Sequence, residues 1–174
     1  MKRAVAVAAV MLLAAHALVA QARKETLEGV RNFTVVDATV GCAGATDLAA
    51  VPAIAARGYK TIINLRLSTE PGAAIEETRA AALEAGLTFI HLPFDGAAPD
   101  RLVVDAFIKT VTDKANQPVF VNCGSANRVG ALWLAKRMIV DKWDQAKALE
   151  EARFIGLSSS ALEKFALDYV AAKR

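Results

Sequence analysis

Two hydrophobic periodicities alternate along the chain. Short apolar runs rich in β-branched residues predict strands, at residues 32–36, 61–65, 87–92 and 118–122. Longer segments with apolar residues at helical spacing predict helices, at residues 46–56, 74–85, 101–116, 128–140, 144–154 and 159–172. This alternation indicates the α/β class, with a single mostly parallel sheet flanked by helices. In such folds the functional loops leave the carboxyl ends of the strands.

Capping residues and glycines set the ends of several predicted helices. Thr46 or Asp47 can cap the first helix, because a short polar side chain accepts a hydrogen bond from the first free amides. Gly58 follows the end of that helix, as is typical of helix C-termini. Residues 41–44, with the sequence GCAG, contain two glycines and are predicted to form a loop. Cys42 is therefore expected to be a loop residue.

The N-terminus has the pattern of a secretory signal peptide. Lys2 and Arg3 precede an uncharged apolar stretch over residues 4–19, and residues 20–22 (AQA) offer a cleavage site of the A-x-A type. We therefore expect a leader over residues 1–22 and one domain over residues 23–174. A periplasmic or secreted location follows. An uncleaved N-terminal anchor is the alternative, although the apolar stretch is short for a membrane span.

Charge and composition exclude some partners. Cleavage after Ala22 removes two of the 21 basic residues and none of the 18 acidic ones, so that the net charge falls from +3 to +1. No basic stripe with interleaved aromatic residues is present, so nucleic acid is not an expected partner. No later stretch of the sequence is typical of a membrane span, and no cluster of His, Cys and Asp has metal-ligand spacing. We expect no metal and no cofactor; the oligomeric state stays open.

The strongest chemical signal is the stretch from Cys123 to Arg128. It lies between a predicted strand and a predicted helix, which places the cysteine beside a helix N-terminus. Loop amides and the helix dipole favour negative charge there, and the same field favours a cysteine thiolate. Arg128 can bind two oxygens of a phosphate or sulfate at once. The stretch predicts covalent chemistry on a tetrahedral anion, with a buried structural cysteine and a surface arginine as the simpler alternatives.

Three motifs in order resemble the bacterial branch of the dual-specificity and tyrosine phosphatase-like superfamily. They are residues 58–66 (GYKTIINLR), residues 92–95 (LPFD) with Pro99, and residues 122–133 (NCGSANRVGALW). More narrowly, the chain is similar to the small phosphatase-like domains related to those of β-lactamase hydrolase-like proteins. The resemblance extends over residues 41–156 and implies a cysteine-phosphatase-like fold.

The resemblance also implies a metal-independent mechanism. Cys123 would be the nucleophile that forms a thiophosphate ester, and Arg128 would hold the phosphoryl oxygens. The substrate would be a phosphoprotein or a small phosphomonoester. The loop amides complete the phosphate-binding set, which comprises Gly124, Ser125, Ala126, Asn127 and Arg128.

The resemblance also suggests a general acid, and a second arginine is a further candidate at the site. Asp95 would protonate the leaving oxygen and then activate water. A simple turn aspartate is the alternative there, and Asp100 is either a second candidate acid or a helix cap. Arg66 either binds substrate or forms an ion pair with Glu70 or Glu77.

Four features of the cysteine loop depart from the common pattern. The common tyrosine phosphatase loop has five residues between cysteine and arginine, whereas this chain has four. Rhodanese sulfurtransferases also have four. Asn122 replaces the usual histidine, Ala126 replaces a glycine, and Val129 stands where many phosphatases have Ser or Thr. If the backbone at position 126 has positive φ, alanine is strained. These departures leave open a sulfurtransferase with a persulfide on Cys123, or a binding module with little turnover.

The two cysteines, Cys42 and Cys123, leave a further alternative open. An exported chain with two cysteines allows a disulfide, which would protect or silence Cys123. The environment of Cys123 favours a free thiolate instead.

Overall fold

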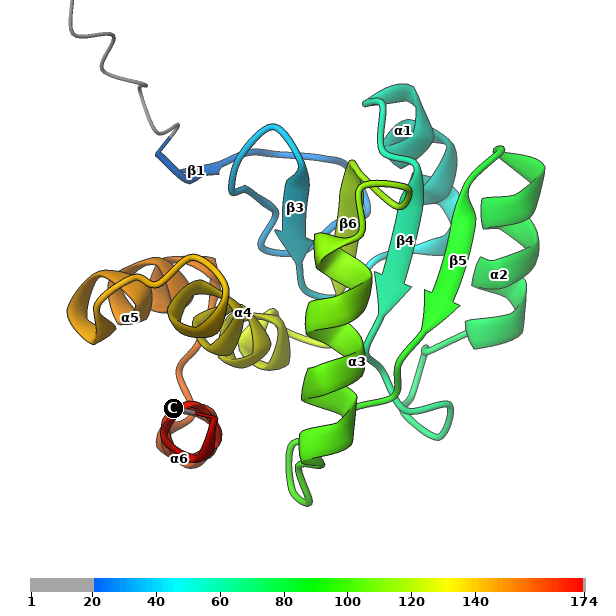
Figure 1. The fold of residues 1–174 in the computed structure, drawn as a ribbon. Coiled ribbons are helices and arrows are strands. Elements are labelled where there is room, and N and C mark those ends of the chain that lie inside the picture. Colours follow the sequence, from blue (N-terminus) through cyan, green and yellow to red (C-terminus); the bar gives the residue numbers. More distant parts are fainter. Residues whose placement is uncertain (1–20, 174) are drawn as a thin grey trace, which may run out of the picture.

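A six-stranded sheet organises the molecule (Figure 1). The computed structural model describes residues 21–173, and the predicted leader lies almost wholly outside the described residues. The strand order is β1-β2-β3-β6-β4-β5. Strands β3, β6, β4 and β5 run parallel, and β2 and β1 extend the sheet with antiparallel pairing. The bounds are β1 Arg23–Lys24, β2 Thr34–Val35, β3 Val40–Ala43, β4 Thr61–Asn64, β5 Thr88–His91 and β6 Val119–Asn122.

Helices cover both faces of the sheet (Figure 1). One side carries a short 3-10 turn and two helices, and the other side carries four helices. The elements are the turn Leu48–Ala50, α1 Val51–Ala56, α2 Ile75–Glu84, α3 Arg101–Thr112, α4 Asn127–Ile139, α5 Gln145–Ile155 and α6 Ser160–Ala172. The predicted α/β class, with one mostly parallel sheet between helices, is confirmed. Side chains of Asp100, Asp144 and Ser159 cap α3, α5 and α6, which explains why these starts were visible in the sequence.

The prediction of a loop at residues 41–44 was wrong. Residues 40–43 form β3, which pairs with β6 at the centre of the sheet, so that Cys42 is a buried strand residue. Small residues are needed here because neighbours lie close. A Cβ on Gly41 would come within 2.2 Å of the Tyr59 hydroxyl oxygen, and one on Gly44 within 3.1 Å of the Ser125 carbonyl carbon. Close packing, rather than a turn, explains these glycines.

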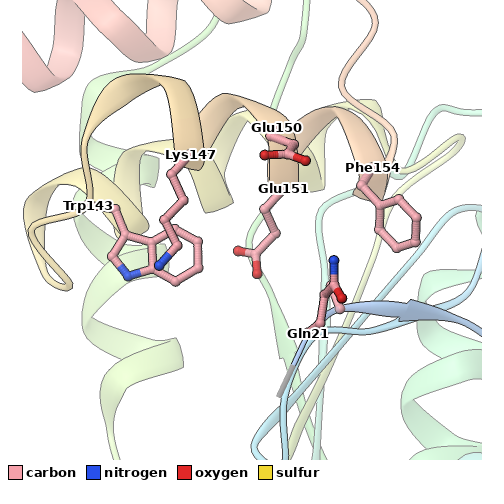
Figure 2. A pocket seen from close by; sticks show the side chains of 7 residues that line it. Gln21, Trp143, Lys147, Glu150, Glu151 and Phe154 are labelled. Atoms are coloured by element: carbon pink, nitrogen blue, oxygen red, sulfur yellow. The ribbon is translucent and has the colours of Figure 1, made fainter. Parts of the chain in front are cut away.

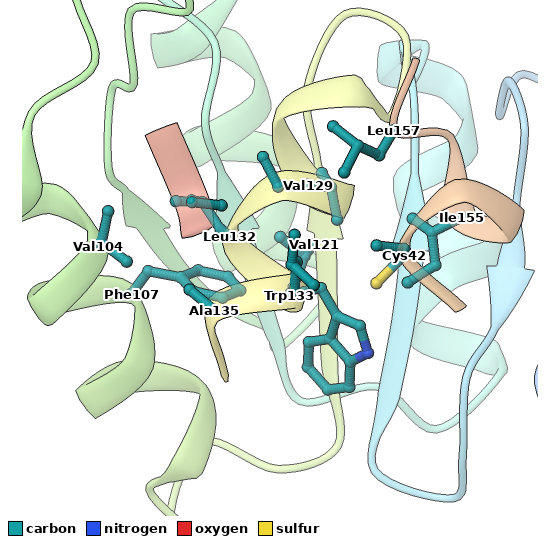
Figure 3. Packing of buried hydrophobic residues seen from close by; sticks show 14 of the residues in the cluster. Cys42, Val104, Phe107, Val121, Val129, Leu132, Trp133, Ala135, Ile155 and Leu157 are labelled. Atoms are coloured by element: carbon teal, nitrogen blue, oxygen red, sulfur yellow. The ribbon is translucent and has the colours of Figure 1, made fainter. Parts of the chain in front are cut away.

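Apolar side chains form a core on each face of the sheet. The larger cluster lies between the sheet and α3–α6 and contains Trp133, Phe107 and both cysteines. Figure 3 shows Cys42 in this layer, close to Ile155 and Trp133. Both cysteines are free and buried in this structure, so the alternative of a disulfide is not realised here. Within residues 21–173, no helix is long and apolar enough to cross a membrane.

Candidate active site

Three loops meet at the carboxyl ends of the parallel strands, and Arg128 joins them. The loops follow β6, β4 and β5. Arg128 begins the first turn of α4, and its Nη1 donates to the Leu65 carbonyl oxygen at 3.2 Å and to the Phe94 carbonyl oxygen at 3.0 Å. These carbonyls belong to the loops after β4 and β5. Arg128 therefore fixes the cysteine loop against the two other loops at this edge.

Glu70 holds the guanidinium of Arg128 from the outer side. Its Oε1 accepts from Nη1 at 2.6 Å and its Oε2 from Nη2 at 2.8 Å. A pair with two parallel hydrogen bonds of this kind fixes the plane of the guanidinium. Glu70 takes the edge between the two Nη atoms, and Nε donates to no oxygen among the residues that the structure describes, so the edge between Nε and Nη2 is the one that a second two-oxygen ligand would use. The sequence had marked Glu70 only as a possible partner of Arg66.

The charges at this junction stabilise one another. Burial opposes the Glu70 carboxylate, but hydrogen bonds from both arginines and from the Leu67 amide outweigh it and lower the pKa of Glu70 to about 2. Burial likewise opposes the charge of Arg128, but Glu70 and the Cys123 sulfur outweigh it and raise the guanidinium pKa above its usual value. Both neighbours therefore favour the charged form of Arg128.

This pairing predicts an acid-dependent loss of stability. A carboxyl with a lowered folded-state pKa stabilises the fold above its unfolded pKa of 4.5, and the contribution is lost as the pH falls from 4.5 to about 2. We expect the difference in unfolding free energy between the wild type and Glu70→Gln to shrink by about 1–2 kcal/mol between pH 7 and pH 2.5. Urea unfolding at several pH values measures it.

The matched control for this prediction is Glu76→Gln. Glu76 also pairs with an arginine, Arg79, but its side chain is 77% exposed. Other carboxylates titrate in wild type and variants alike and cancel in the difference. A flat difference for Glu70→Gln, like the one expected for Glu76→Gln, would contradict the assigned pairing.

Arg66 has a supporting position in the same junction. Its Nε donates to Glu70 Oε2 at 3.2 Å, while its Nη1 and Nη2 donate to the carbonyl oxygens of Gly72 and Pro71 at 2.7 and 2.6 Å. The side chain is therefore committed to the ion pair that the sequence had given as one of its two alternatives. In this arrangement Arg66 shapes the loop after β4 and presents no free edge to a substrate.

Cys123 lies at the base of this junction, directly after β6. Its amide donates to the Ala43 carbonyl oxygen at 3.3 Å, and the residue is fully buried. The residue is therefore covered by the surrounding loops in this structure. Asn122, which precedes it, is also buried, and its Oδ1 has no hydrogen-bond partner among the residues that the structure describes.

The cysteine loop presents its amides to the site because its carbonyls are held on the outside. The Gly124 carbonyl oxygen accepts from the Ala45 amide at 3.0 Å. In a trans peptide the N–H points away from the C=O, so the Ser125 amide is aimed to the other side, toward the cradle. At the far end, Asn127 Oδ1 accepts from the amides of Ser158 and Ser159 at 3.1 and 3.2 Å. These contacts fix the loop from its β3 side and its α6 side.

Ala126 has a left-handed backbone, the conformation in which we expected an alanine at this position to be strained. Its φ is +73°, where a side chain is strained by about 1–2 kcal/mol. Gly124, in contrast, has no positive φ, and a Cβ there would make only ordinary contacts with Arg128 and Glu70. The alanine therefore occupies the loop position that favours glycine, and the glycine occupies one where alanine fits.

We expect Ala126→Gly to stabilise the protein by about 0.5–1 kcal/mol. Relief of the positive φ outweighs the larger entropy of glycine in the unfolded chain. Thermal and urea unfolding measure the effect. The control is Ala131→Gly at a buried position within α4, the helix that Ala126 precedes; this variant should destabilise by about 1 kcal/mol. Two variants that destabilise alike would contradict the strain at position 126.

Asp95 and Asp100 occupy different kinds of position. Asp100 is exposed, and its Oδ1 caps α3 by accepting from the Leu102 amide at 2.8 Å. Asp95 is flanked by two residues that touch Arg128: Phe94 through its carbonyl, and Gly96, whose Cβ position lies 3.7 Å from Arg128 Cγ. The Asp95 Oδ1 accepts from the Ala97 amide at 2.8 Å. This geometry favours Asp95 over Asp100 as the acid near the cysteine loop.

A separate hollow of about 380 Å³ lies elsewhere on the surface. Figure 2 shows the side chains that line it, among which Trp143 and Phe154 flank the carboxylates of Glu150 and Glu151. None of its lining residues belongs to the cysteine loop or to the loops that Arg128 joins. Among the described residues, no group of three or more His, Cys, Asp or Glu is placed to hold a metal ion.

A protein-family model accounts for most of the chain. The model described as "DSP-PTPase phosphatase fused to NAD+ Kinase" matches residues 15–167. The chain belongs to this phosphatase family. The predicted resemblance to the dual-specificity and tyrosine phosphatase-like superfamily is thereby confirmed. No match was found among curated protein sequences.

Solved structures of phosphatases share the fold. A DUF442 phosphatase of Shewanella putrefaciens CN-32 aligns with a TM-score of 0.71 and 19% identity, covering 84% of this chain and 95% of that one. The catalytic core of the PP-IP phosphatase SIW14 of Saccharomyces cerevisiae gives 0.69 and 18%, covering 85% and 95%. TpbA of Pseudomonas aeruginosa gives 0.64 and 21%, covering 82% and 84%. At these identities the likeness concerns the fold, and the roles of Cys123, Arg128 and Asp95 stay predictions.

Proposed function

We propose that the protein is an exported, metal-independent, cysteine-dependent phosphatase. Its substrate would be a phosphoprotein or a small phosphomonoester. The observation that carries this proposal is the clamp on Arg128: Glu70 holds the edge between the two Nη atoms, and the guanidinium also interacts with the Cys123 side chain. Family membership supports the reaction class, and the leader pattern in residues 1–22 supports export.

The proposed reaction has two steps. The Cys123 thiolate attacks phosphorus, the bond from phosphorus to the ester oxygen breaks, and Asp95 gives its proton to the leaving oxygen. Asp95, now a carboxylate, takes a proton from water as that water attacks phosphorus. The sulfur–phosphorus bond breaks, and inorganic phosphate and the thiolate are released. Throughout, Arg128 and the amides of residues 124–128 stabilise the charge that spreads over the phosphoryl oxygens.

Two neighbours indicate substrates worth assaying. TpbA has been solved in a complex with pTyr, and SIW14 is a PP-IP phosphatase. Both are properties of those proteins. For this chain they support an assay panel of phosphotyrosine peptides, phosphoserine peptides and small phosphomonoesters, with inositol pyrophosphates as a separate, phosphoanhydride class.

The first test is hydrolysis of para-nitrophenyl phosphate by residues 23–174, with and without dithiothreitol. Hydrolysis in the presence of EDTA is the expected result. The same protein is assayed for thiocyanate formation from thiosulfate and cyanide, because the four-residue loop is shared with sulfurtransferases. Thiocyanate without phosphate release would overturn the proposal in favour of a sulfurtransferase. Neither reaction from folded, reduced protein would leave an anion-binding module.

The proposed export is tested separately. The full chain carrying a C-terminal tag is expressed in a bacterium, and the cells are fractionated. The expected result is a periplasmic or secreted product that begins at residue 23 by N-terminal sequencing. A cytoplasmic product that retains residues 1–22 would contradict export without touching the proposed chemistry.

A further inference from the structure

Asn32 connects three segments that lie far apart in the sequence. It precedes β2 and has a left-handed backbone, with φ +52°, a conformation that asparagine tolerates better than most residues. Its Nδ2 donates to the Ile155 carbonyl oxygen at 2.9 Å and to the Ser125 carbonyl oxygen at 3.4 Å. Ile155 ends α5, and Ser125 is the middle residue of the cysteine loop. The side-chain amide therefore bridges the end of a helix and the back of the loop.

We propose that Asn32 is a positioning residue for the anion-binding loop; this inference rests on the proposed function. The planar trans peptide between Ser125 and Ala126 has its C=O and N–H on opposite sides. A donor that holds the Ser125 oxygen from behind therefore aims the Ala126 N–H forward, to the side on which the Ser125 N–H also lies. Without this donor, rotation of that peptide would remove one of the hydrogen bonds to the phosphoryl oxygens.

The peptide needs such support because its second residue is strained. Ala126 has φ +73°, and an alanine relaxes from this region when nothing holds it there. Tight packing behind the loop opposes the relaxation. A Cβ on Gly156 would come within 2.7 Å of Asn32 Nδ2 and 2.9 Å of Ala126 Cβ. Asn32, Gly156 and Ala126 therefore pack closely against one another behind the cysteine loop. Of these three residues, Asn32 has the side-chain amide.

Lys24 fixes which way the amide of Asn32 points. The Lys24 ammonium donates to Asn32 Oδ1, to Thr34 Oγ1 at 2.8 Å and to the Ile155 carbonyl oxygen at 3.2 Å. With Oδ1 bound to this cation, Nδ2 faces the two carbonyl oxygens. Lys24 is the second residue after the predicted cleavage site, so the processed chain keeps it. The N-terminal strand β1 is thereby connected to the cysteine loop through a single side chain.

The test compares Asn32→Asp with Asn32→Gly. Aspartate keeps the size of the side chain and an acceptor for Lys24, but places an oxygen opposite two carbonyl oxygens. Glycine keeps the left-handed backbone and removes the side chain. We expect about a tenfold weaker affinity for inorganic phosphate in both variants, with the larger loss in Asn32→Asp, and a comparable fall in kcat/KM for para-nitrophenyl phosphate. All measurements are made well below each variant's Tm.

The matched control is Asn116→Asp. The Nδ2 of Asn116 donates to the Thr110 carbonyl oxygen of α3 at 2.9 Å, a bond of the same kind that does not touch the cysteine loop. This variant should lose stability and keep phosphate affinity. If an Asn32 variant does not fold, Lys24→Met tests the same role instead, because it changes an exposed side chain. This variant should weaken phosphate binding about two- to threefold.

Phosphate affinity is measured by calorimetry in the Cys123→Ser background, so that it does not depend on turnover. A lower Tm with unchanged phosphate affinity in the Asn32 variants, or unchanged affinity in Lys24→Met when those variants do not fold, would overturn the positioning role. Absence of phosphate binding before any change at Asn32 would overturn it too. Phosphate binding without hydrolysis by the wild type would instead refute the proposed phosphatase and leave the role of Asn32 intact.

Discussion

Cys123→Ser should abolish hydrolysis of para-nitrophenyl phosphate, with a fall in kcat of at least about 10³-fold. Serine has nearly the same size, so the buried position accepts it, but its hydroxyl is not ionised near neutral pH and is a poor nucleophile. The loop that binds the anion is unchanged, so phosphate binding should persist. Steady-state rates and phosphate calorimetry measure the two effects. For the wild type, acid quenching during turnover should trap a phosphoryl group on Cys123, detectable by peptide mass spectrometry.

The second cysteine provides the matched control for this prediction. Cys42 is also fully buried, and burial, reinforced by the charges of Glu151 and Asp37, raises the pKa of its thiol well above the usual value. This thiol is therefore a poor nucleophile, and Cys42→Ala should keep the rate in the presence of reductant. Full activity in Cys123→Ser, or loss of activity in reduced Cys42→Ala, would contradict the assignment of the nucleophile.

A comparison of the wild type with Cys42→Ala, each assayed with and without reductant, tests the alternative of a disulfide between Cys42 and Cys123. Both thiols are free in this structure, but Cys42 lies in β3, Cys123 directly follows the neighbouring strand β6, and both belong to the same buried cluster. If the bond forms in an oxidising compartment, wild type loses activity without reductant and Cys42→Ala does not. Equal dependence on reductant in both proteins would indicate oxidation of Cys123 alone.

Most of the fold was visible in the sequence because its elements carry strong local signals. The strand at 61–65 is β-branched, and the caps at Asp100, Asp144 and Ser159 are specific side-chain hydrogen bonds. Strand β3 was missed because its small residue Gly41 is required by tertiary packing against Tyr59. Apart from Val40, this strand consists of residues with little β-propensity, and only its pairing with neighbouring strands reveals it.

The site was predictable where its chemistry lies in one contiguous motif, and less so where it depends on contacts across the fold. The contiguous motif from Cys123 to Arg128 was enough to predict an anion-binding loop. Glu70 is 58 residues from Arg128 in sequence and Asn32 is 93 residues from Ser125, and nothing local marks either as a partner of the loop. For Glu70 the only local signal was its position four residues after Arg66, which predicted an ion pair with Arg66 and not with Arg128.

Arg128→Lys should lower kcat by about 10²–10³-fold while the protein stays folded. Lysine keeps a positive charge and an aliphatic stem, but one ammonium cannot satisfy both Glu70 oxygens and two backbone carbonyls while also offering two parallel donors to a phosphate. The loss of one well-placed donor to transition-state charge has an effect of this size. Steady-state kinetics should show the change mainly in kcat, because charge on the phosphoryl oxygens shifts most in the transition state.

Arg137→Lys separates this effect from a simple loss of stability. Arg137 lies in the same helix, is buried, and forms two hydrogen bonds to the Glu151 carboxylate, at 2.6 and 3.0 Å. It therefore loses the same kind of ion pair without touching the cysteine loop. We expect both variants to have a lower Tm and only Arg128→Lys to lose rate at temperatures where both are folded. Equal rates in the two variants would mean that Arg128 holds the three loops together and contributes nothing specific to the reaction.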